Sequence, residues 1–257
     1  MATIETTADQ QDQFEREGFF LVEDLFSADE CDDILGHLER TTFELALGQA
    51  EDGPLSYRPM MHLASDELKA VATDPRWGPI VMPLLGPSVR LYWEQGVAKP
   101  PQARTVLPWH QDNGYAPTIP ERYVTCWLAL DDADTENGCL WVIPGSHREG
   151  TVRHHDVDGS PFRSGYDGSE EGVAVPVRRG SVLVFSSLVM HKSGPNVTDR
   201  QRRAWILQYC EGDAIHARTR QLLDDRLLVA DDGRWLDEPI QQRPTDVKEI
   251  VRNYERG

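Results

Sequence analysis

Two short segments that lie far apart in the sequence impose the strongest constraint on the fold. Residues 109–115 carry His110 and Asp112, and residues 189–193 carry His191. Side chains two residues apart in an extended segment point to the same side, so His110 and Asp112 face one point in space. A fold that returns His191 to that point assembles two imidazoles and one carboxylate. Such a set can occupy one face of an octahedral metal ion and leave the opposite face open.

The His-x-Asp spacing alone is a weak signal, because a chain with eight histidines can contain one by chance. A surface histidine beside a solvated aspartate is the alternative interpretation. Arg202 favours the metal site over this alternative. It lies in residues 199–209, which are typical of a turn that leads into a strand. If that strand pairs beside His191, the Arg202 guanidinium can bind a carboxylate near the metal through two parallel hydrogen bonds. A metal triad with a carboxylate clamp predicts an iron and 2-oxoglutarate site.

The chain also resembles the phytanoyl-CoA dioxygenase family of Fe(II)/2-oxoglutarate oxygenases. The resemblance rests on four motifs in the same order, at residues 109–112 (Trp-His-Gln-Asp), 138–147, 180–185 and 191–209. Residues 14–20 also look like the start of that family. The similarity therefore covers about residue 10 to about residue 210, and four ordered motifs are far more specific than one.

The resemblance implies a role for individual side chains. Fe(II) is expected to bind to His110, Asp112 and His191. The co-substrate 2-oxoglutarate is expected to be anchored by Arg202 and Ser193. Further co-substrate contacts of the family match Trp127, Gln95 and Arg58, for which a structural role is the competing interpretation. The candidate substrate contacts beside the metal are Asn113 and Tyr115.

The implied reaction uses O2, converts 2-oxoglutarate to succinate and CO2, and oxidises a C–H bond of a small molecule. Related halogenases have a small residue in place of the carboxylate, so Asp112 favours hydroxylation or oxidative ring closure. Relatives act on acyl-CoA thioesters, amino-acid-like solutes, terpenoids, polyketides and sugar-containing antibiotics. The acidic chain disfavours CoA, whose phosphates bind Lys and Arg. A specialised, antibiotic-type metabolite is the expected substrate, with an acyl-CoA thioester as the alternative.

Two other classes of function are compatible with parts of the pattern. A non-catalytic β-barrel binding module could keep the fold and lose the iron, but the three metal residues and Arg202 disfavour it. A zinc hydrolase could use two histidines and a carboxylate. A hydrolase would have no use for a carboxylate clamp. Replacing Arg202 would therefore impair an oxygenase and leave a hydrolase unaffected.

Local patterns predict helices first and strands afterwards. Residues 8–17 and 28–44 indicate helices, the second opened by a capping box of Ser27 and Glu30, and two shorter helices are expected to begin at Ser65 and Asp74. Apolar segments predict strands at 89–95, 123–130, 139–143, 173–177 and 181–185. An Asn-Gly turn is expected to reverse the chain into 139–143, and 173–185 is expected to form a hairpin. Residues 48–60 and 148–172 are expected to be loops.

This order of elements predicts a mainly β fold with flanking helices, a double-stranded β-helix of the jelly-roll type. We expect a single domain over residues 1–257. Its helical part is expected at about 8–86 and its barrel at about 88–210. A polar C-terminal tail, 211–257, is expected to contain a helix near 245–254.

Composition disfavours several kinds of partner. The formal net charge of −17, from 43 acidic and 26 basic residues, disfavours binding to nucleic acid or anionic lipid. The sequence contains no run of about eighteen apolar residues, so no membrane span is predicted. The N-terminus lacks the pattern of a secretory signal. The four cysteines have no metal-binding spacing and are expected to be reduced core residues. A cytoplasmic protein with a small-molecule substrate is expected, and the oligomeric state is not predicted.

Overall fold

The computed structural model describes residues 6–41, 56–160 and 162–246. The helices and 3₁₀ turns are α1 (Ala8–Glu17), α2 (Ala28–Arg40), η1 (Met61–Leu63), α3 (Asp66–Ala72), η2 (Pro75–Trp77), α4 (Gly78–Leu85), α5 (Asp112–Tyr115) and η3 (Ser146–Glu149). The strands of the first half are β1 (Phe19–Val22), β2 (Ser56–Pro59), β3 (Val89–Lys99), β4 (Leu107–His110), β5 (Thr118–Ile119) and β6 (Val124–Ala129). The later strands are β7 (Leu140–Val142), β8 (His155–Asp156), β9 (Arg163–Ser164), β10 (Val173–Val175), β11 (Val182–Ser186), β12 (His191–Ser193), β13 (Arg202–Glu211), β14 (Ile215–His216), β15 (Leu227–Asp231) and β16 (Arg234–Ile240).

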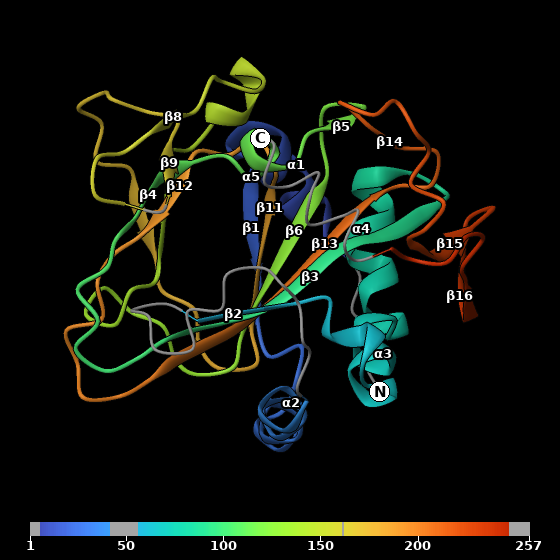
Figure 1. Cartoon of the computed structure of the whole chain (residues 1–257), viewed down its shortest axis with the longest axis horizontal. Coiled ribbons are helices and arrows are strands. Elements are labelled where there is room, and N and C mark those ends of the chain that lie inside the picture. The colour runs from blue at the N-terminus through green and yellow to red at the C-terminus, as the bar shows by residue number, and fades with distance from the viewer. Residues whose placement is uncertain (1–5, 42–55, 161, 247–257) are drawn as a thin grey trace.

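Two antiparallel sheets form the centre of the molecule (Figure 1). The large sheet has the order β1-β11-β6-β13-β3-β15-β16, with β2 paired to β3. The small sheet has the order β10-β7-β12-β4. Buried apolar side chains from both sheets form one cluster, which includes Trp127 and Phe185 of the large sheet and Leu140 and Val142 of the small one. The predicted jelly-roll fold is confirmed as two facing sheets, which do not join into a closed barrel within the described residues.

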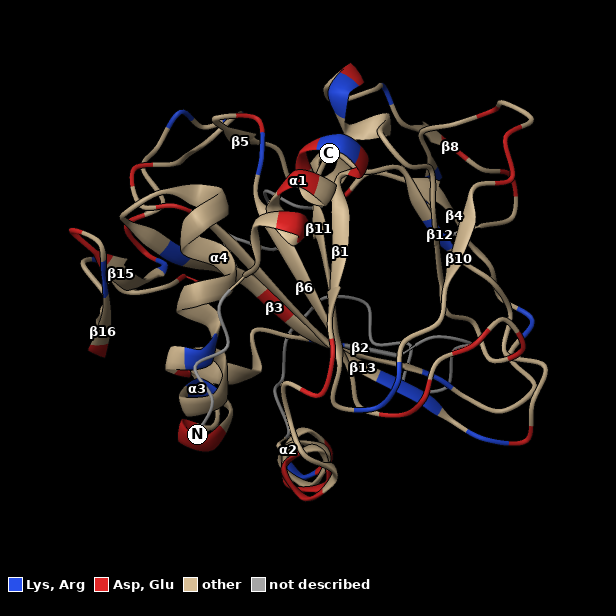
Figure 2. Ribbon diagram, turned by 180° about the vertical axis from the view of Figure 1, so that it is seen from behind, with Lys and Arg blue, Asp and Glu red and all other residues tan. Residues whose placement is uncertain are grey.

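The alternation of side chains along β13 divides the large sheet into two faces. Trp205, Leu207 and Tyr209 belong to the cluster that the helices α2, α3 and α4 cover. Arg202, Ala204 and the residues in phase with them point towards the small sheet. Figure 2 shows a basic segment at the start of β13, while acidic residues gather on the helices and the connecting loops. The charge of the chain is therefore carried mostly outside the two sheets.

The predicted elements of the N-terminal part are largely confirmed. Helix α1 ends at Glu17 and is capped by Gly18, which adopts a φ of 86° that glycine tolerates. The capping box before α2 is present, since Ser27 and Glu30 each bond the other's backbone N–H. Ser65 caps α3 and Asp74 caps η2, as expected. Residues 42–44 of the predicted second helix lie outside the described part of the chain.

The predicted pairing of neighbouring strands is wrong at two places. Strand β7 follows β6 in sequence but pairs with β10 and β12 in the other sheet. Strands β10 and β11 likewise belong to different sheets, so residues 173–185 do not form a hairpin. The turns themselves exist, with a φ of 90° at Gly138 and 83° at Gly180. A turn fixes only the local reversal, whereas the sheet that each strand joins depends on which apolar face it can bury.

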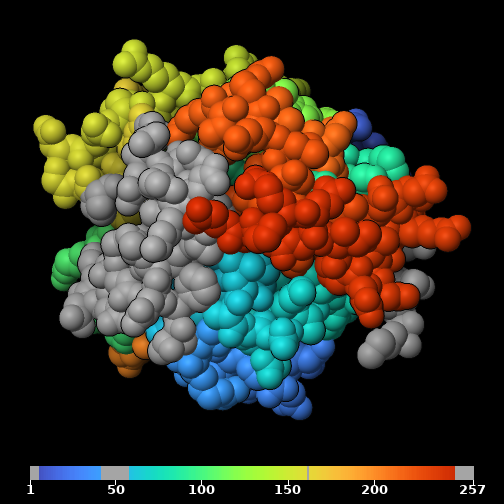
Figure 3. Space-filling view, turned by 45° about the vertical axis from the view of Figure 1, so that its right-hand side comes forward, coloured from blue at the N-terminus to red at the C-terminus, as the bar shows by residue number. Residues whose placement is uncertain are grey.

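Three segments contain more structure than was predicted. Residues 56–59 of the expected loop form β2, and 48–55 of that loop lie outside the described residues. The long segment 148–172 contains the two-stranded β8–β9 ladder. The C-terminal tail adds β15 and β16 to the edge of the large sheet, and Figure 3 shows this segment lying over the α3–α4 region. All of these strands except β15 are short or polar, so their periodicity does not predict them, whereas β15 is a five-residue segment with four buried apolar residues.

The predicted C-terminal helix is not seen at residues 245 and 246, and the rest of it lies outside the described part. The four cysteines are buried and unpaired as disulfides, as expected. No helix among the described residues is long and apolar enough to cross a membrane.

Candidate metal and co-substrate site

His110 and His191 lie opposite each other in the small sheet. They are partners in the register of β4 and β12, and their ring centres are 4.1 Å apart. The Nδ1 atom of His110 lies 2.9 Å from the carbonyl of Pro108, and that of His191 lies 2.9 Å from the carbonyl of Val189. A carbonyl only accepts, so each Nδ1 carries the proton and donates it. The Nε2 atoms of both histidines are therefore available to bind a further group.

Asp112 completes the set from the first position of α5. Its Oδ1 lies 3.8 Å from the Nε2 of His110 and 3.5 Å from the Nε2 of His191. Its Oδ2 accepts hydrogen bonds from the Thr125 hydroxyl over 2.6 Å and from the Gln208 amide over 2.9 Å. Because both donors come from the large sheet, the carboxylate is oriented so that Oδ1 faces the two imidazoles.

The three ligand atoms lie within 4.8 Å of one another, and no other such group occurs among the residues that the structure describes. Burial and the neighbouring His191 lower the pKa of His110 well below its usual value. Its imidazole is therefore neutral at pH 7, which leaves the lone pair free for a metal. Two histidines oriented by backbone carbonyls, with a carboxylate held by outer hydrogen bonds, form the arrangement that suits non-haem Fe(II).

Arg202 and Trp127 meet on the inner face of the large sheet. The Arg202 guanidinium carbon is 5.4 Å from the centre of the Trp127 ring, and both side chains are buried. Strand β13 pairs with β3 and β6, not with β12. The expected pairing beside His191 is therefore wrong, and Arg202 approaches the interior from the facing sheet instead.

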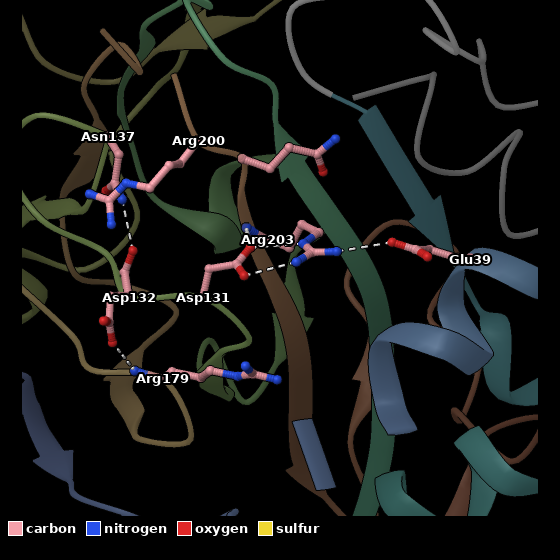
Figure 4. Close-up of a pocket in the computed structure, with 8 residues that line it drawn as sticks. Glu39, Asp131, Asp132, Asn137, Arg179, Arg200 and Arg203 are labelled. Carbon is pink, nitrogen blue, oxygen red and sulfur yellow. Dashed lines mark hydrogen bonds and ion pairs between the residues drawn. The ribbon is translucent and has the colours of Figure 1, made fainter. Parts of the chain in front are cut away.

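The neighbouring Arg203 points the other way, as the alternation of β13 predicted. It donates to Asp131 over 2.8 Å and forms an ion pair with Glu39 at 3.0 Å (Figure 4). These residues line a polar surface hollow of about 550 Å³. The hollow's carboxylates already bind arginines of the chain, so we assign it no role in the chemistry of the metal site.

Ser193 is buried on β12 and shares a face with His191. Two residues along a strand span about 6–7 Å, which is about the length of a five-carbon dicarboxylate. The Ser193 hydroxyl accepts a hydrogen bond from the Lys99 ammonium over 2.9 Å. Lys99 is not among the site residues expected from the sequence, because it lies beyond the predicted strand 89–95. Its pairing with Arg202 in the register of β3 and β13 is the missing signal.

The other two predicted co-substrate contacts occupy different surroundings. Gln95 lies on the same face of β3 as Lys99, and its side-chain oxygen accepts from the Trp93 indole over 3.1 Å. Arg58 is exposed on β2 and donates to the carbonyls of Leu38 and Glu39 at the end of α2. These contacts stabilise a helix end. The structure does not bring Arg58 together with the metal residues.

The two predicted substrate contacts also differ from each other. Asn113 is fully buried, where it donates to the Thr151 hydroxyl over 2.6 Å and accepts from the Thr118 backbone. It thereby stabilises the turn that carries Asp112. Tyr115 is half-buried, with its ring 5.5 Å from that of His110. Its hydroxyl bonds the backbone of Arg163 in β9, so Tyr115 links the metal site to the β8–β9 ladder.

His154 and Gln111 form a second link between the metal site and the 148–172 segment, and the sequence did not predict it. The Nε2 of His154 accepts from the backbone N–H of Gln111 over 2.9 Å, between the two metal residues. The side chain of Gln111 in turn bonds the backbone of Gly150, Val152 and Leu188. Gln111 alternates with His110 and Asp112, so it points away from the metal and into the 148–172 segment. Only that alternation could have suggested its role.

Comparison with known proteins identifies the family. The profile of the family "Phytanoyl-CoA dioxygenase (PhyH)" matches residues 14–204. The chain belongs to the phytanoyl-CoA dioxygenase family. A phytanoyl-CoA dioxygenase domain-containing protein 1 homolog of Caenorhabditis briggsae is 28% identical over 79% of this chain and 91% of its own length. The ectoine dioxygenase of Bordetella parapertussis is 28% identical over 79% of this chain and 75% of its own length.

Solved structures agree on the fold. EvdO2 from Micromonospora carbonacea var. aurantiaca, complexed with 2-oxoglutarate, has a TM-score of 0.69 at 22% identity, over 86% of this chain and 96% of its own. The epimerase SnoN, in complex with Fe3+, alpha ketoglutarate and nogalamycin RO, has a TM-score of 0.68 at 24% identity, over 93% of this chain and 94% of its own. The phytanoyl-CoA dioxygenase family uses non-haem iron and 2-oxoglutarate, and this member is a dioxygenase with those cofactors. A binding module and a zinc hydrolase are not supported.

Proposed function

We propose that this phytanoyl-CoA dioxygenase family member hydroxylates or oxidatively cyclises a small specialised metabolite, with His110, Asp112 and His191 as the iron ligands. The observation that carries the proposal is the orientation of Asp112. One of its oxygens is held by Thr125 and Gln208, and the other faces both histidines. A carboxylate present in this position occupies the coordination site that a halide would need, which favours hydroxylation or ring closure.

Arg202 and Ser193 are proposed to bind the distal carboxylate of 2-oxoglutarate. They project from opposite sheets into the same interior, and Trp127 packs against Arg202. A buried guanidinium presents a planar fork of donors that matches a carboxylate. With iron, 2-oxoglutarate and O2 bound, the centre supplies an oxidant for a C–H bond and releases succinate and CO2. The protein residues hold the co-substrate in one orientation and exclude water around it.

The substrate is proposed to enter beside Tyr115, whose ring lies next to His110 and whose hydroxyl holds the β8–β9 ladder. The segment 148–172 then forms one wall of the entrance. SnoN, whose structure contains nogalamycin RO, has the same fold, which supports a natural-product substrate. An acyl-CoA thioester remains the second candidate, supported by the family to which the chain belongs. The whole chain is proposed to act as one domain.

The test is an anaerobic titration of the Fe(II)-loaded protein with 2-oxoglutarate, followed by the visible metal-to-ligand charge-transfer band. Wild type is expected to develop the band, and Asp112→Ala is expected to lose or weaken it. Asp156→Ala is the matched control, because Asp156 has a 98% exposed side chain in the β8–β9 ladder. A folded, iron-loaded wild type without the band would overturn the proposal. Coupled succinate release on a metabolite panel, with acyl-CoA thioesters included, then separates the two substrate classes.

A further inference from the structure

Tyr115 of α5 is bound by two different arginines. Its hydroxyl donates to the backbone carbonyl of Arg163 over 3.0 Å and accepts from the backbone N–H of Arg163 over 2.8 Å. Its own backbone carbonyl accepts a hydrogen bond from the Arg218 guanidinium over 3.2 Å. The Tyr115 ring lies 5.5 Å from the His110 ring, centre to centre. Both arginines are therefore attached to the residue that lies beside a metal ligand.

The two arginines come from segments on either side of α5. Arg163 belongs to β9, and Arg218 follows β14, which pairs with β5 just after α5. Figure 1 shows α5 between the β8–β9 ladder and the β5–β14 pair. The second segment is fixed to the end of α5, because the Ala217 N–H donates to the Pro117 carbonyl over 3.0 Å. Two segments that are remote in sequence thus place a cation on each side of the same turn.

The charges of Arg163 and Arg218 are close enough to act on each other. Burial lowers the pKa of Arg218, Tyr92 opposes this effect, and the charge of Arg163 lowers the pKa further. Like charges at one place repel, and an anion that binds between them removes the repulsion. The pair therefore favours a ligand that carries negative charge.

The contacts of Arg163 leave it a strong cation. Its guanidinium donates to the neutral carbonyl of His154 over 3.1 Å. Its Nε lies 3.6 Å from Asp156, whose side chain is 98% exposed. Water screens such an ion pair strongly, so Asp156 does little to offset the charge of the arginine.

The segment that carries Arg218 is basic, although the chain as a whole is acidic. Residues 214–223 contain His216, Arg218 and Arg220 and no aspartate or glutamate, whereas the chain has a formal net charge of −17. An acidic surface repels an anionic small molecule, and a local basic site attracts it. The local charge beside α5 is therefore suited to a ligand that the rest of the surface would repel.

We propose that the substrate carries an anionic oxygen group, a carboxylate or a phosphate, and that Arg163 and Arg218 bind this group at the entrance beside Tyr115. The inference rests on the proposed function, in which the substrate enters there. A guanidinium presents a planar pair of N–H donors that matches both kinds of group. Holding the charged group at the entrance directs the remainder of the substrate towards His110. The two arginines thus select and orient the substrate, and they take no part in its oxidation.

The test measures the Kd of small probes by anaerobic isothermal titration of the protein loaded with Fe(II) and saturating 2-oxoglutarate. Benzoate and phenyl phosphate represent the two anionic groups, and benzamide is the neutral counterpart of benzoate. Wild type is expected to bind at least one of the anions at least about tenfold more tightly than benzamide. Arg163→Gln and Arg218→Gln are each expected to weaken binding of that anion by about tenfold.

Arg178→Gln is the matched control. Arg178 also has an exposed side chain in a weak ion pair, with Glu23 at 3.3 Å. It precedes β11 at Val182, whereas α5 contacts the chain just after the other end of β11, where the Ser187 carbonyl accepts from the Asn113 N–H over 3.0 Å. This variant is expected to bind the anions like wild type. All three variants are expected to keep the wild-type Kd for 2-oxoglutarate within about twofold, measured from the charge-transfer band.

Two results would overturn the inference. One is a wild type that binds neither anion more tightly than benzamide, and the other is unchanged anion affinity in folded Arg163→Gln and Arg218→Gln. Tighter binding of phenyl phosphate than of benzoate would identify a phosphate-bearing substrate, and the reverse order would identify a carboxylate. A wild type with no charge-transfer band would instead overturn the proposed function, so the two failures are distinguishable.

Discussion

Thr125 donates a hydrogen bond of 2.6 Å to Asp112, from the sheet that faces the two histidines. Gln208 of the neighbouring strand donates both to the same carboxylate oxygen and to the Thr125 hydroxyl. The small sheet thus provides the imidazoles, while the large sheet fixes the orientation of the carboxylate. Metal binding is therefore coupled to the correct packing of the two sheets.

Removing this hydroxyl is expected to weaken metal binding. Thr125→Val keeps the shape of the side chain but leaves Asp112 with one outer donor, and such second-layer losses typically weaken metal affinity by about 10- to 100-fold. Fe(II) or Co(II) affinity measured by anaerobic titration checks this. Thr73→Val is the control, because its hydroxyl bonds the Lys69 carbonyl in α3. Equal metal affinity in wild type and Thr125→Val would show that Asp112 needs no outer support.

The two adjacent arginines of β13 are expected to behave differently. Arg202→Gln removes the buried guanidinium, and truncating a buried charged partner costs about 2–5 kcal/mol of binding free energy. The Kd for 2-oxoglutarate should therefore rise by at least about 30-fold. Arg203→Gln serves as the control, since Arg203 points outwards and pairs with Asp131 and Glu39. Isothermal titration with 2-oxoglutarate measures both, and an equal loss in the two variants would contradict the assignment.

His154 is expected to hold the 148–172 segment against the metal site. His154→Phe keeps an aromatic ring but leaves the buried Gln111 N–H without its acceptor, which costs about 1–3 kcal/mol. Limited proteolysis should cleave the segment faster, and turnover should fall. His155→Phe is the control, because His155 is exposed and forms only a surface ion pair with Asp167. Equal cleavage rates in the two variants would show that His154 does not hold the 148–172 segment in place.

Lys99 is expected to reduce the stability of the ligand-free protein in a pH-dependent way. Its folded-state pKa of about 7 lies below its unfolded value of about 10.4, so the unfolded chain binds more protons between these values. Stability should therefore rise with pH from about 7 to about 10. The charged groups facing Lys99 from its neighbours are Arg202 and, when ionised, Cys139.

Lys99→Met should accordingly stabilise the ligand-free protein most at pH 6 and progressively less towards pH 10. Thermal unfolding of both proteins across this range, with Lys192→Met as the charge-loss control, measures the difference. A stability difference that does not change with pH would show that burial does not depress the pKa of Lys99 in the folded state.

Much of the site could be predicted because its signals are local. His110 and Asp112 alternate in one extended segment, and the alternation of β13 separates Arg202 from Arg203. Capping boxes and the glycine after α1 are likewise encoded within a few residues. Gln111 and Lys99 were missed since their partners, Val152 and Ser193, are remote in the chain.

The sequence by itself determined the reaction class and the expected metal ligands, through ordered motifs that resemble one family. It also determined the helices and central strands, because residue type and short-range periodicity act over single turns and strands. Only the tertiary structure decided which sheet each strand joins. It placed β13 opposite β12 and set Lys99 against Ser193. The reason is that strand pairing and inter-sheet contacts depend on burying whole faces at once, and no local pattern specifies which distant face will be the partner.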